Sequence, residues 1–581
     1  MSRARRVRLA SAGAIVLVLL VGAVWLVVTA LLARRELGAV RHELPALRRA
    51  LSSGDYVRAG TIAHSLEGHA RRAHELTSGP AWASAAALPW AGQPAETVRV
   101  LSTQSDRLGA KVLPGVLDMA NQLSADTLRH GTDIDLTKLV RAAPVLDHAA
   151  SAATTAAAAI IRTPTHTWLG TVDSARSTVL SQLGTVANQL DGASRAVHTL
   201  LPMLGATGTQ RYFIGFLNES QARGVGGLPG AFAIVTADHG RLTFTHFQND
   251  NTLFRLSVHV DLGAEFHAHY GFANPTGIYG DSDYSPHFPY AAQIWAAMWE
   301  KKSGEHVTGA VALDPTALSY LLAVTGPATL PSGERVTAAN VVSLTEKIQY
   351  SRYANDEAGR KKFLVELAAS VSHRVISGHG DTKHLLRAAV LAASQRRILV
   401  WSADPVVEAN IVRFGYAGVV QATGSPFTGF VVDNDSGSKL DYYLGRSMTY
   451  SRTGCGAGST ARATFVITNG APAKGLPKHV TVRRHNPPPG MKPGDNRLLI
   501  TYYGSAGAKI RSVTIDGRRV AFTSAPENGL VTITVAAELK VGQSRTITVT
   551  LGEPPANRPV QVLNQPLVRG MKTRVTGDVC G

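Results

Sequence analysis

Hydrophobic and polar positions divide the chain into regions of three kinds. Residues 9–33 carry no charged side chain, and residues 35 to about 200 place apolar side chains at helical spacing. In many later segments, apolar and polar residues alternate with a period of two. An uncharged run of about 25 apolar or small residues can cross a hydrocarbon core about 30 Å thick. We therefore predict a transmembrane helix over residues 9–33.

The charges that flank this run predict its orientation. Four arginines crowd the segment 1–8, whereas a very long chain follows on the other side. Positive charge is retained on the cytoplasmic side. We expect a cytoplasmic tip at 1–8, a single-pass anchor in the cell membrane and an extracytoplasmic body. The alternative is a cleaved signal peptide, but its apolar region is usually only about 7–15 residues long.

Residues 34–204 predict a helical stalk or bundle. Segments such as LGAVRHELPALRRAL and GTIAHSLEGHARRAHEL have the three- and four-residue apolar spacing of amphipathic helices. Gly79 and Pro80 break this pattern. Trp82 and Trp90 follow between prolines, where they either pack a corner between helices, which we favour, or lie on the membrane. A stalk of this kind can also pair with another copy.

Residues 205–430 predict a mixed α/β domain. Segments 211–218 and 231–238 are apolar and β-rich, and a glycine-rich loop over residues 218–230 is expected to join them. Backbone N–H groups in such a loop can converge on an anion, and an arginine adds a planar guanidinium. The alternative is a tight loop shaped by turn geometry alone. The candidate phosphate-binding residues here are Asn218, Glu219, Arg223, Gly226 and Gly227.

Other polar residues of this domain are weaker candidates for a ligand site. Asp250, Asp281 and Asp283 lie in oxygen-rich segments of the kind that hold Mg²⁺ or Mn²⁺, but such segments are more often turns and caps. His267 and His269 form a pair without further zinc ligands nearby. The metal and any other cofactor therefore stay unassigned, with Mg²⁺ or Mn²⁺ as candidates.

A second group of candidate phosphate ligands follows a predicted helix that begins at Thr337. Arg352 and Arg360 lie on either side of a short turn, so both guanidiniums can point into one pocket. The alternative is that each forms a surface ion pair with Asp356 or Glu357.

Residues 431–581 predict an antiparallel β-sandwich with a binding or spacing role. Short strands such as ATFVITN and LVTITVAAEL are separated by turn residues. Cys455 and Cys580 are the two cysteines of the chain. In an oxidising compartment we expect them to form a disulfide, and two free thiols are the alternative. The whole chain is thus predicted to be an α+β protein.

The net charge of +18 raises the question of nucleic acid. The basic residues are scattered, without the clustered basic helix or the aromatic–basic alternation of nucleic-acid modules, so we expect no nucleic acid. For an exported body, anionic lipid head groups, polyprenyl phosphates or phosphate-bearing wall polymers are the expected acidic partners.

Several separate motifs resemble one bacterial envelope family. NESQARGVGG, DSDYSPHFPYAAQ, VALDPTALSYLLAVTGPATL and SKLDYYLGRSMTY together are similar to domain-of-unknown-function 4012 (DUF4012), over most of residues 80 to 510. That family usually has an acidic residue before its Phe-Pro, where this chain has His287. The difference argues against a metal role for this segment.

A more distant resemblance concerns mechanism. The strand-loop-strand, the strand ending at Asp314 and YSRYANDEAGRKKFLVELAASV look like the LytR-CpsA-Psr phosphotransferases, which move glycopolymers from polyprenyl-pyrophosphate carriers to the cell wall. This resemblance implies that Arg352 and Arg360 hold the pyrophosphate, with Arg223 approaching. Those enzymes carry Arg-Ser-Asp at the start of the second strand, where this chain reads Gly-Leu-Pro-Gly-Ala.

Two hypotheses of function follow. In the first, the α/β domain binds a polyprenyl-(pyro)phosphate-linked envelope glycopolymer and transfers it. In the second, the protein has no catalytic activity and organises envelope assembly by binding or scaffolding. The aspartate of the Arg-Ser-Asp motif is missing from this chain, and the absence of this acidic group favours binding over transfer.

Overall fold

The computed structural model describes residues 3–123, 128–377, 380–482, 492–578 and 580, without the side chains of residues 3–19, 52 and 130. The chain forms two compact units. We call Met1–Leu128 with Asp135–Leu201 the helical unit, and Arg129–Ile134 with Pro202–Gly581 the mixed unit. The mixed unit contains an α/β domain and a β-sandwich.

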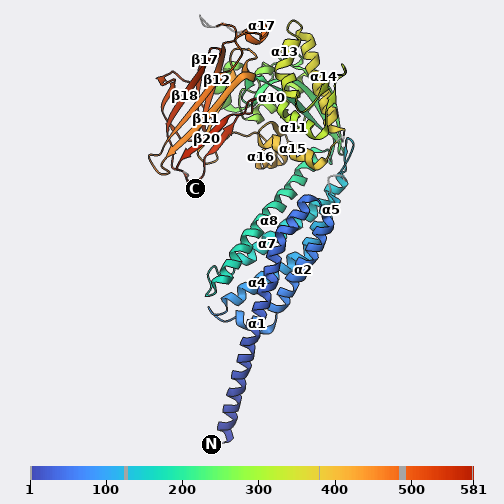
Figure 1. The fold of residues 1–581 in the computed structure, drawn as a ribbon, viewed down its shortest axis with the longest axis vertical. Helices are drawn as coiled ribbons and strands as arrows, with labels where there is room; N and C mark the ends of the chain where they lie inside the picture. The colour runs from blue at the N-terminus through green and yellow to red at the C-terminus, as the bar shows by residue number, and fades with distance from the viewer. Residues whose placement is uncertain (1–2, 124–127, 378–379, 483–491, 579, 581) are drawn as a thin grey trace. The chain divides into compact units, whose positions relative to one another are not determined.

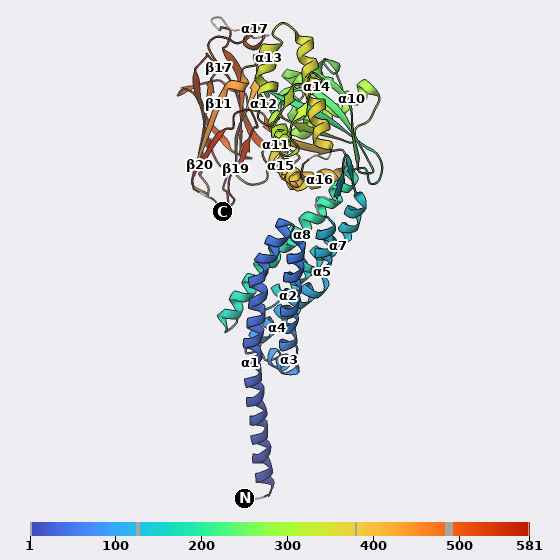
Figure 2. The same ribbon diagram turned by 45° about the vertical axis from the view of Figure 1, so that its right-hand side comes forward.

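The helical unit consists of long helices, as predicted. α1 and α2 run side by side (Figures 1 and 2), and small or aliphatic side chains such as Leu47, Ala59 and Leu66 fill the seam between them. Gly79 is the N-cap of α3 and Pro80 its first residue, which explains the break predicted here. The helices are α1 (Arg3–Ser53), α2 (Tyr56–Thr77), α3 (Pro80–Ala86), α4 (Gln93–Lys111), α5 (Leu113–Gln122), α7 (Leu136–Ile161) and α8 (Gly170–Met203).

The predicted membrane span is the first part of α1, which continues without a break for 51 residues. Within the described residues, no helix is both long enough and apolar enough to span a bilayer. Residues 9–19 of the predicted span lie outside the residues whose side chains are described.

The two connector tryptophans have different environments. Trp82 is buried, and its indole Nε1 donates a hydrogen bond of 2.9 Å to Thr29 Oγ1 of α1. Trp90 is 69% exposed. The expectation that both would pack a corner between helices is therefore confirmed for Trp82 and is wrong for Trp90.

The α/β domain is built on a mixed seven-stranded sheet with the order β1-β2-β5-β4-β3-β6-β9. β3 and β6 are parallel, and the other neighbouring pairs are antiparallel. The strands are β1 (Arg129–His130), β2 (Asp133–Ile134), β3 (Gln210–Arg223), β4 (Gly226–Asp238), β5 (Arg241–Asn249), β6 (Gly309–Leu313) and β9 (Ile398–Ser402).

Helices cover both faces of this sheet, so its interior strand β3 is buried and nearly continuous in apolar residues. Phe213 packs with Trp295 of α10 on one face, while Tyr212 and Ile214 face the core that includes Ala368 of α14. The helices are α9 (Gly263–Tyr270), α10 (Phe288–Ser303), α11 (Pro315–Thr325), α12 (Val341–Ser343), α13 (Gln349–Arg352), α14 (Glu357–Ile376), α15 (Thr382–Ser394) and α16 (Pro405–Phe414).

Short elements connect these strands and helices. β7 (Ala328–Thr329) and β8 (Arg335–Val336) form a short antiparallel hairpin. Brief 3₁₀ turns occur at η1 (Asp250–Thr252), η2 (Gly271–Ala273), η3 (Tyr279–Asp281) and η5 (Asp441–Tyr443).

The predicted glycine-rich loop is instead the end of a β-hairpin. β3 continues to Arg223 and β4 begins at Gly226, with those two residues paired. The prediction of a loop over 218–230 is wrong because backbone pairing resumes after a register shift between Asn218 and Ala222. Gly227 packs so closely that an added Cβ would lie 2.4 Å from the Asn218 backbone, so glycine is needed here for packing.

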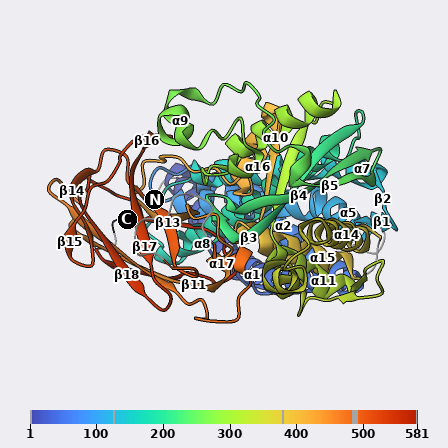
Figure 3. The same ribbon diagram turned by 90° about the horizontal axis from the view of Figure 1, so that it is seen from above.

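The C-terminal region is a sandwich of two sheets that share one core (Figure 3). Their orders are β16-β17-β13-β10-β19 and β15-β14-β18-β12-β11-β20. The strands are β10 (Phe427–Asn434), β11 (Leu444–Thr453), β12 (Thr460–Asn469), β13 (Asn496–Gly504), β14 (Lys509–Ile515), β15 (Arg518–Arg519), β16 (Pro526–Glu527), β17 (Leu530–Leu539), β18 (Ser544–Gly552), β19 (Gln561–Asn564) and β20 (Lys572–Gly577).

Two features of the sandwich bear on the predictions. Cys455 and Cys580 form a disulfide, which confirms the expected bridge. The other neighbouring strands of the sandwich are antiparallel, as predicted, whereas β19 pairs with β10 and β20 pairs with β11 in the parallel direction. The long return from the far end of the chain brings each final strand in alongside an early one.

Candidate functional site

The register shift at the end of β3 turns polar groups towards the helices that follow β8. The side-chain amide of Asn218 donates a hydrogen bond of 2.7 Å to the Tyr350 hydroxyl. The backbone N–H and the hydroxyl of Ser220 donate to Glu346 Oε2, at 2.7 and 2.8 Å. Residues in such irregular strand segments are frequently re-aimed towards functional sites.

The partner segment is itself irregular. A helix was predicted from Thr337, but the segment consists of α12, a π-helical stretch over Leu344–Ile348 (η4), and α13. The wider turn buries Glu346 and Tyr350 against β3 while Lys347 between them remains exposed. Isolated π-helical turns are rare and occur frequently at functional sites.

These side chains lie at a small pocket of about 210 Å³, which we call the lysine pocket. Three lysines contribute to it, Lys347 from η4, Lys439 before η5 and Lys474 after β12. Glu346 is the one acidic group among the lining residues. The full lining is Glu346, Lys347, Tyr350, Ser351, Lys439, Tyr443, Pro472, Lys474, Gly475, Leu476, Pro477 and Val480.

A buried acidic cluster lies behind Glu346. Arg397 makes ion pairs with Asp314 at 2.6 Å and with Glu219 at 3.3 Å, and all three side chains are buried. Desolvation raises the pKa of Glu219 well above its usual range and raises that of Asp314. Burial likewise raises the pKa of Glu346 to about 8, against the lowering effect of the Ser220 hydrogen bonds. Glu346 is therefore largely neutral at pH 7, so it does not oppose an anion in the lysine pocket.

The raised pKa of Glu346 predicts a pH dependence of stability. Because the folded-state pKa of about 8 exceeds the ordinary 4.5, its contribution to stability is complete below pH 4.5 and is lost as the pH rises through 8. We expect the Tm to fall from pH 5 to pH 8, and Glu346→Gln to make that fall shallower. Thermal unfolding at a series of pH values measures this. Glu357→Gln, at an exposed carboxylate, is the matched control, and equal slopes for both variants would contradict the assignment.

The structure does not bring the predicted phosphate-binding arginines together. Arg223 is buried, with its Nη2 donating to Asp281 Oδ1 at 2.8 Å, its Nη1 to the Asn434 carbonyl at 2.9 Å, and its guanidinium 4.4 Å from the centre of the Tyr284 ring. It is thus fully engaged inside the mixed unit. Gly226 and Gly227 lie in the hairpin beside it.

The other two arginines also separate. Arg352 makes a two-pronged ion pair with Glu334, at 2.6 and 2.9 Å, and lies over the Phe363 ring. Arg360 lies 5.5 Å from the centre of the Tyr350 ring. Arg360 and Asn218 therefore both contact Tyr350. Glu219 belongs to the adjoining acidic cluster, and Arg352 is instead paired with Glu334.

The aspartates considered for a metal have separate surroundings. Asp250 makes an ion pair of 2.9 Å with Lys361, and Asp281 pairs with Arg223. Asp283 is buried with neither carboxylate oxygen hydrogen-bonded, and desolvation raises its pKa well above the usual range. Across the described part of the chain, no three His, Cys, Asp or Glu side chains are grouped as metal ligands would be.

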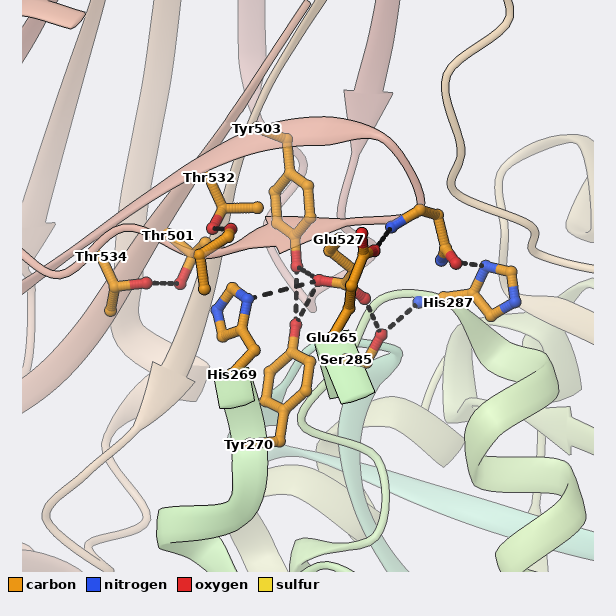
Figure 4. Close-up of polar contacts among 12 residues, drawn as sticks. Glu265, His269, Tyr270, Ser285, His287, Thr501, Tyr503, Glu527, Thr532 and Thr534 are labelled. Atoms are coloured by element: carbon orange, nitrogen blue, oxygen red, sulfur yellow. Dashed lines mark hydrogen bonds and ion pairs between the residues drawn. The ribbon is translucent and has the colours of Figure 1, made fainter. Parts of the chain in front are cut away.

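A second buried polar cluster joins the α/β domain to the sandwich at Glu527 (Figure 4). Its carboxylate accepts hydrogen bonds from Tyr270 at 2.7 Å, Tyr503 at 2.6 Å and Ser285 at 2.5 Å. His269 lies beside it, and burial lowers the pKa of its imidazole to about 4, so this ring is neutral at pH 7. We interpret this cluster as a structural junction, since the hydroxyls of Tyr270, Ser285 and Tyr503 are all directed at the carboxylate.

His287, which replaces the acidic residue usual in the resembled family, belongs to the same junction. Its Nδ1 lies 3.1 Å from Asn528 Nδ2 and 3.1 Å from the Val420 backbone nitrogen. Burial lowers its pKa to about 4. The neutral ring therefore accepts hydrogen bonds between the domain and the sandwich.

Sequence reasoning missed the residues of the lysine pocket. Glu346, Lys347, Lys439 and Lys474 come from three segments that no local motif connects. Two motifs behind the resemblances do reach the pocket: SKLDYYLGRSMTY contains Lys439, and YSRYANDEAGRKKFLVELAASV contains Tyr350 and Ser351.

Comparison with known proteins identifies one family. Residues 207–350 match the family described as "Protein of unknown function (DUF4012)". No curated protein matches the chain. The match is narrower than the predicted extent of residues 80 to 510, and it covers β3 to β8 together with the η4 segment of the lysine pocket. Over residues 207–350, this chain is therefore similar to the DUF4012 family.

Proposed function

We propose that this is a membrane-anchored extracytoplasmic protein of cell-envelope assembly, whose mixed unit binds the phosphate group of a polyprenyl-(pyro)phosphate-linked envelope glycopolymer. The observation that carries the proposal is the lysine pocket, whose lining includes three lysines and a single, largely neutral carboxyl group. Lysine ammonium groups bind phosphate as point charges, and here no ionised carboxylate in the lining competes with it.

The size of the pocket restricts the ligand. A volume of about 210 Å³ is smaller than the range of roughly 300–1,000 Å³ typical of sites for drug-sized ligands. The pocket suits a phosphate or pyrophosphate group and leaves the lipid and glycan parts outside. The Tyr350 hydroxyl and Arg360 add polar character next to it.

Exposed apolar side chains support the membrane placement. The described part of α1 exposes large hydrophobic side chains over more than three helical turns, which is unusual on a protein surface in contact with water. These residues are Leu20, Val21, Val24, Trp25, Val27, Val28, Leu31 and Leu32. Together with the arginines of segment 1–8, they favour a single-pass anchor with a cytoplasmic N-terminus.

Binding is favoured over transfer. Glu219 and Asp314 are held by Arg397, and Glu346 accepts two hydrogen bonds from Ser220, so each nearby carboxyl group has a structural partner. Transfer of the polymer, as in the LytR-CpsA-Psr enzymes, is the second candidate because Glu346 lines the pocket. Metal-dependent release of polymer from its lipid carrier would distinguish it from binding.

The test is pyrophosphate binding by the full-length protein in detergent. Lys347→Ala with Lys474→Ala should weaken the binding of inorganic pyrophosphate, and of a polyprenyl pyrophosphate, by at least about tenfold, measured by calorimetry. Arg352→Ala is the matched control, because it removes a cation that the sequence also suggested but that pairs with Glu334 outside the pocket. Equal weakening by Arg352→Ala, or no weakening by the lysine variant, would overturn the assignment.

A further inference from the structure

The helical unit contains a much larger cavity that the proposed function does not use. It is an open groove of about 1640 Å³ formed by α1, α2, α4, α5, α7 and α8, with the α3 region and the start of α8 at one end. Aliphatic side chains such as Leu44, Leu101, Ile160 and Leu183 dominate its lining. α1 and α8 can be followed along this unit in Figures 1 and 2. We call this cavity the helical groove.

The charges of the helical groove all have one sign. Among its described lining residues, the charged ones are Arg34, Arg41 and Arg48, and no acidic residue is present. Their seven-residue spacing places them on one face of α1, about 10 Å apart along the axis at each step. All three side chains are exposed, and within the described residues none of them has an ion-pair partner. An apolar groove edged by unpaired cations matches an amphiphile with an anionic head.

One end of the helical groove is continuous with the apolar surface of α1. Its lining begins at Ala23 and Leu26, within the predicted span, and includes Trp82 and Trp168 at the same end. Trp168 is 53% exposed, and its indole Nε1 donates a hydrogen bond of 3.0 Å to the Ala91 carbonyl. Tryptophan is enriched where a membrane meets water. This end of the groove therefore has the character of a surface at the bilayer interface.

We propose that the helical groove takes up the hydrocarbon chain of an anionic phospholipid-like membrane lipid, with the phosphate of its head group at Arg41 and Arg48. The groove exceeds the roughly 300–1,000 Å³ of an ordinary small-molecule site, as a long chain requires. Its continuity with α1 gives a lipid a route in from the bilayer. This inference goes beyond the proposed function because it gives the helical unit a ligand of its own.

The test uses the full-length protein, delipidated in detergent, and two lipids with identical chains. Phosphatidylglycerol should be retained about tenfold better than zwitterionic phosphatidylcholine in native mass spectrometry. Arg41→Glu with Arg48→Glu should abolish this preference. Gly38→Trp should reduce retention of both lipids, because Gly38 lines the groove and a Cβ added there meets no atom within 4 Å on the protein.

Two variants outside the groove serve as controls. Arg107→Glu changes an exposed arginine of α4, and Gly60→Trp adds the same bulk at another open helical position. Both should retain the lipids like the unmodified protein, and all variants should keep their helical circular dichroism. Retention of neither lipid, or equal effects of groove and control variants, would overturn the proposal. A lipid-free dimer that Gly38→Trp dissociates would show instead that a second copy fills the groove.

Lipid retention by the helical groove and pyrophosphate binding in the lysine pocket can each fail without the other. The groove variants should leave pyrophosphate binding unchanged, since that depends on Lys347 and Lys474 of the mixed unit. The lysine variant should in turn leave the preference for phosphatidylglycerol unchanged.

Discussion

Replacing Arg397 with leucine should destabilise the mixed unit by about 3–5 kcal/mol, because it removes the cation that pairs with two buried acidic groups, Asp314 and Glu219. Asp314 is 1% exposed and Glu219 is fully buried, so neither can recover its hydration in the folded state. The Arg397 guanidinium also donates to the Leu567 carbonyl at 3.1 Å, which connects the α/β domain to the C-terminal segment. Chemical denaturation followed by fluorescence measures the change in the free energy of unfolding.

Two further variants test the cause of this loss. Arg413→Leu removes an exposed arginine of α16 and should change stability by less than about 0.5 kcal/mol. Adding Glu219→Gln and Asp314→Asn to Arg397→Leu should restore part of the lost stability, because no buried acidic group is then left without its cation. If the triple variant is no more stable than Arg397→Leu, lost packing rather than uncompensated charge is responsible.

Removal of the disulfide between Cys455 and Cys580 should also strongly lower the free energy of unfolding. The bridge joins residues 125 positions apart, and closing a loop of that length restricts the unfolded chain. We expect Cys455→Ser with Cys580→Ser to lower the free energy of unfolding by about 2–5 kcal/mol. Thermal unfolding of the double variant should match that of the reduced unmodified protein, which controls for the substitutions themselves. Unchanged stability in both samples would contradict this prediction.

The sequence correctly predicted those features that depend on a single segment or a single residue pair. The apolar run at residues 211–218 became the buried interior strand β3, because a strand covered on both faces needs nearly continuous apolar residues. The helical periodicity after residue 35 gave the long helices of the helical unit. The two cysteines allowed only one intramolecular pairing, which the structure confirms.

The candidate site was harder to predict because it depends on contacts between distant segments. Arg223 looked like a ligand-binding residue in a glycine loop, but Asp281 and the Asn434 carbonyl occupy its guanidinium. Nothing in the residues next to Arg223 indicates those partners. Lys347 lay in a predicted helix, and nothing in that segment indicates that Lys439 and Lys474, which are distant in sequence, line the same pocket.

The parallel pairing of β19 and β20 imposes an order on biosynthesis. β10 and β11 are made early in the sandwich, yet each gains one neighbour from the last residues of the chain, with Phe427 facing Gln561 and Ser447 facing Lys572. Contacts so far apart in sequence form slowly, since loop-closure entropy must be overcome first. Both sheets therefore remain one strand short until residues 561–577 have been synthesised, so the cell must keep these open edges from aggregating in the meantime.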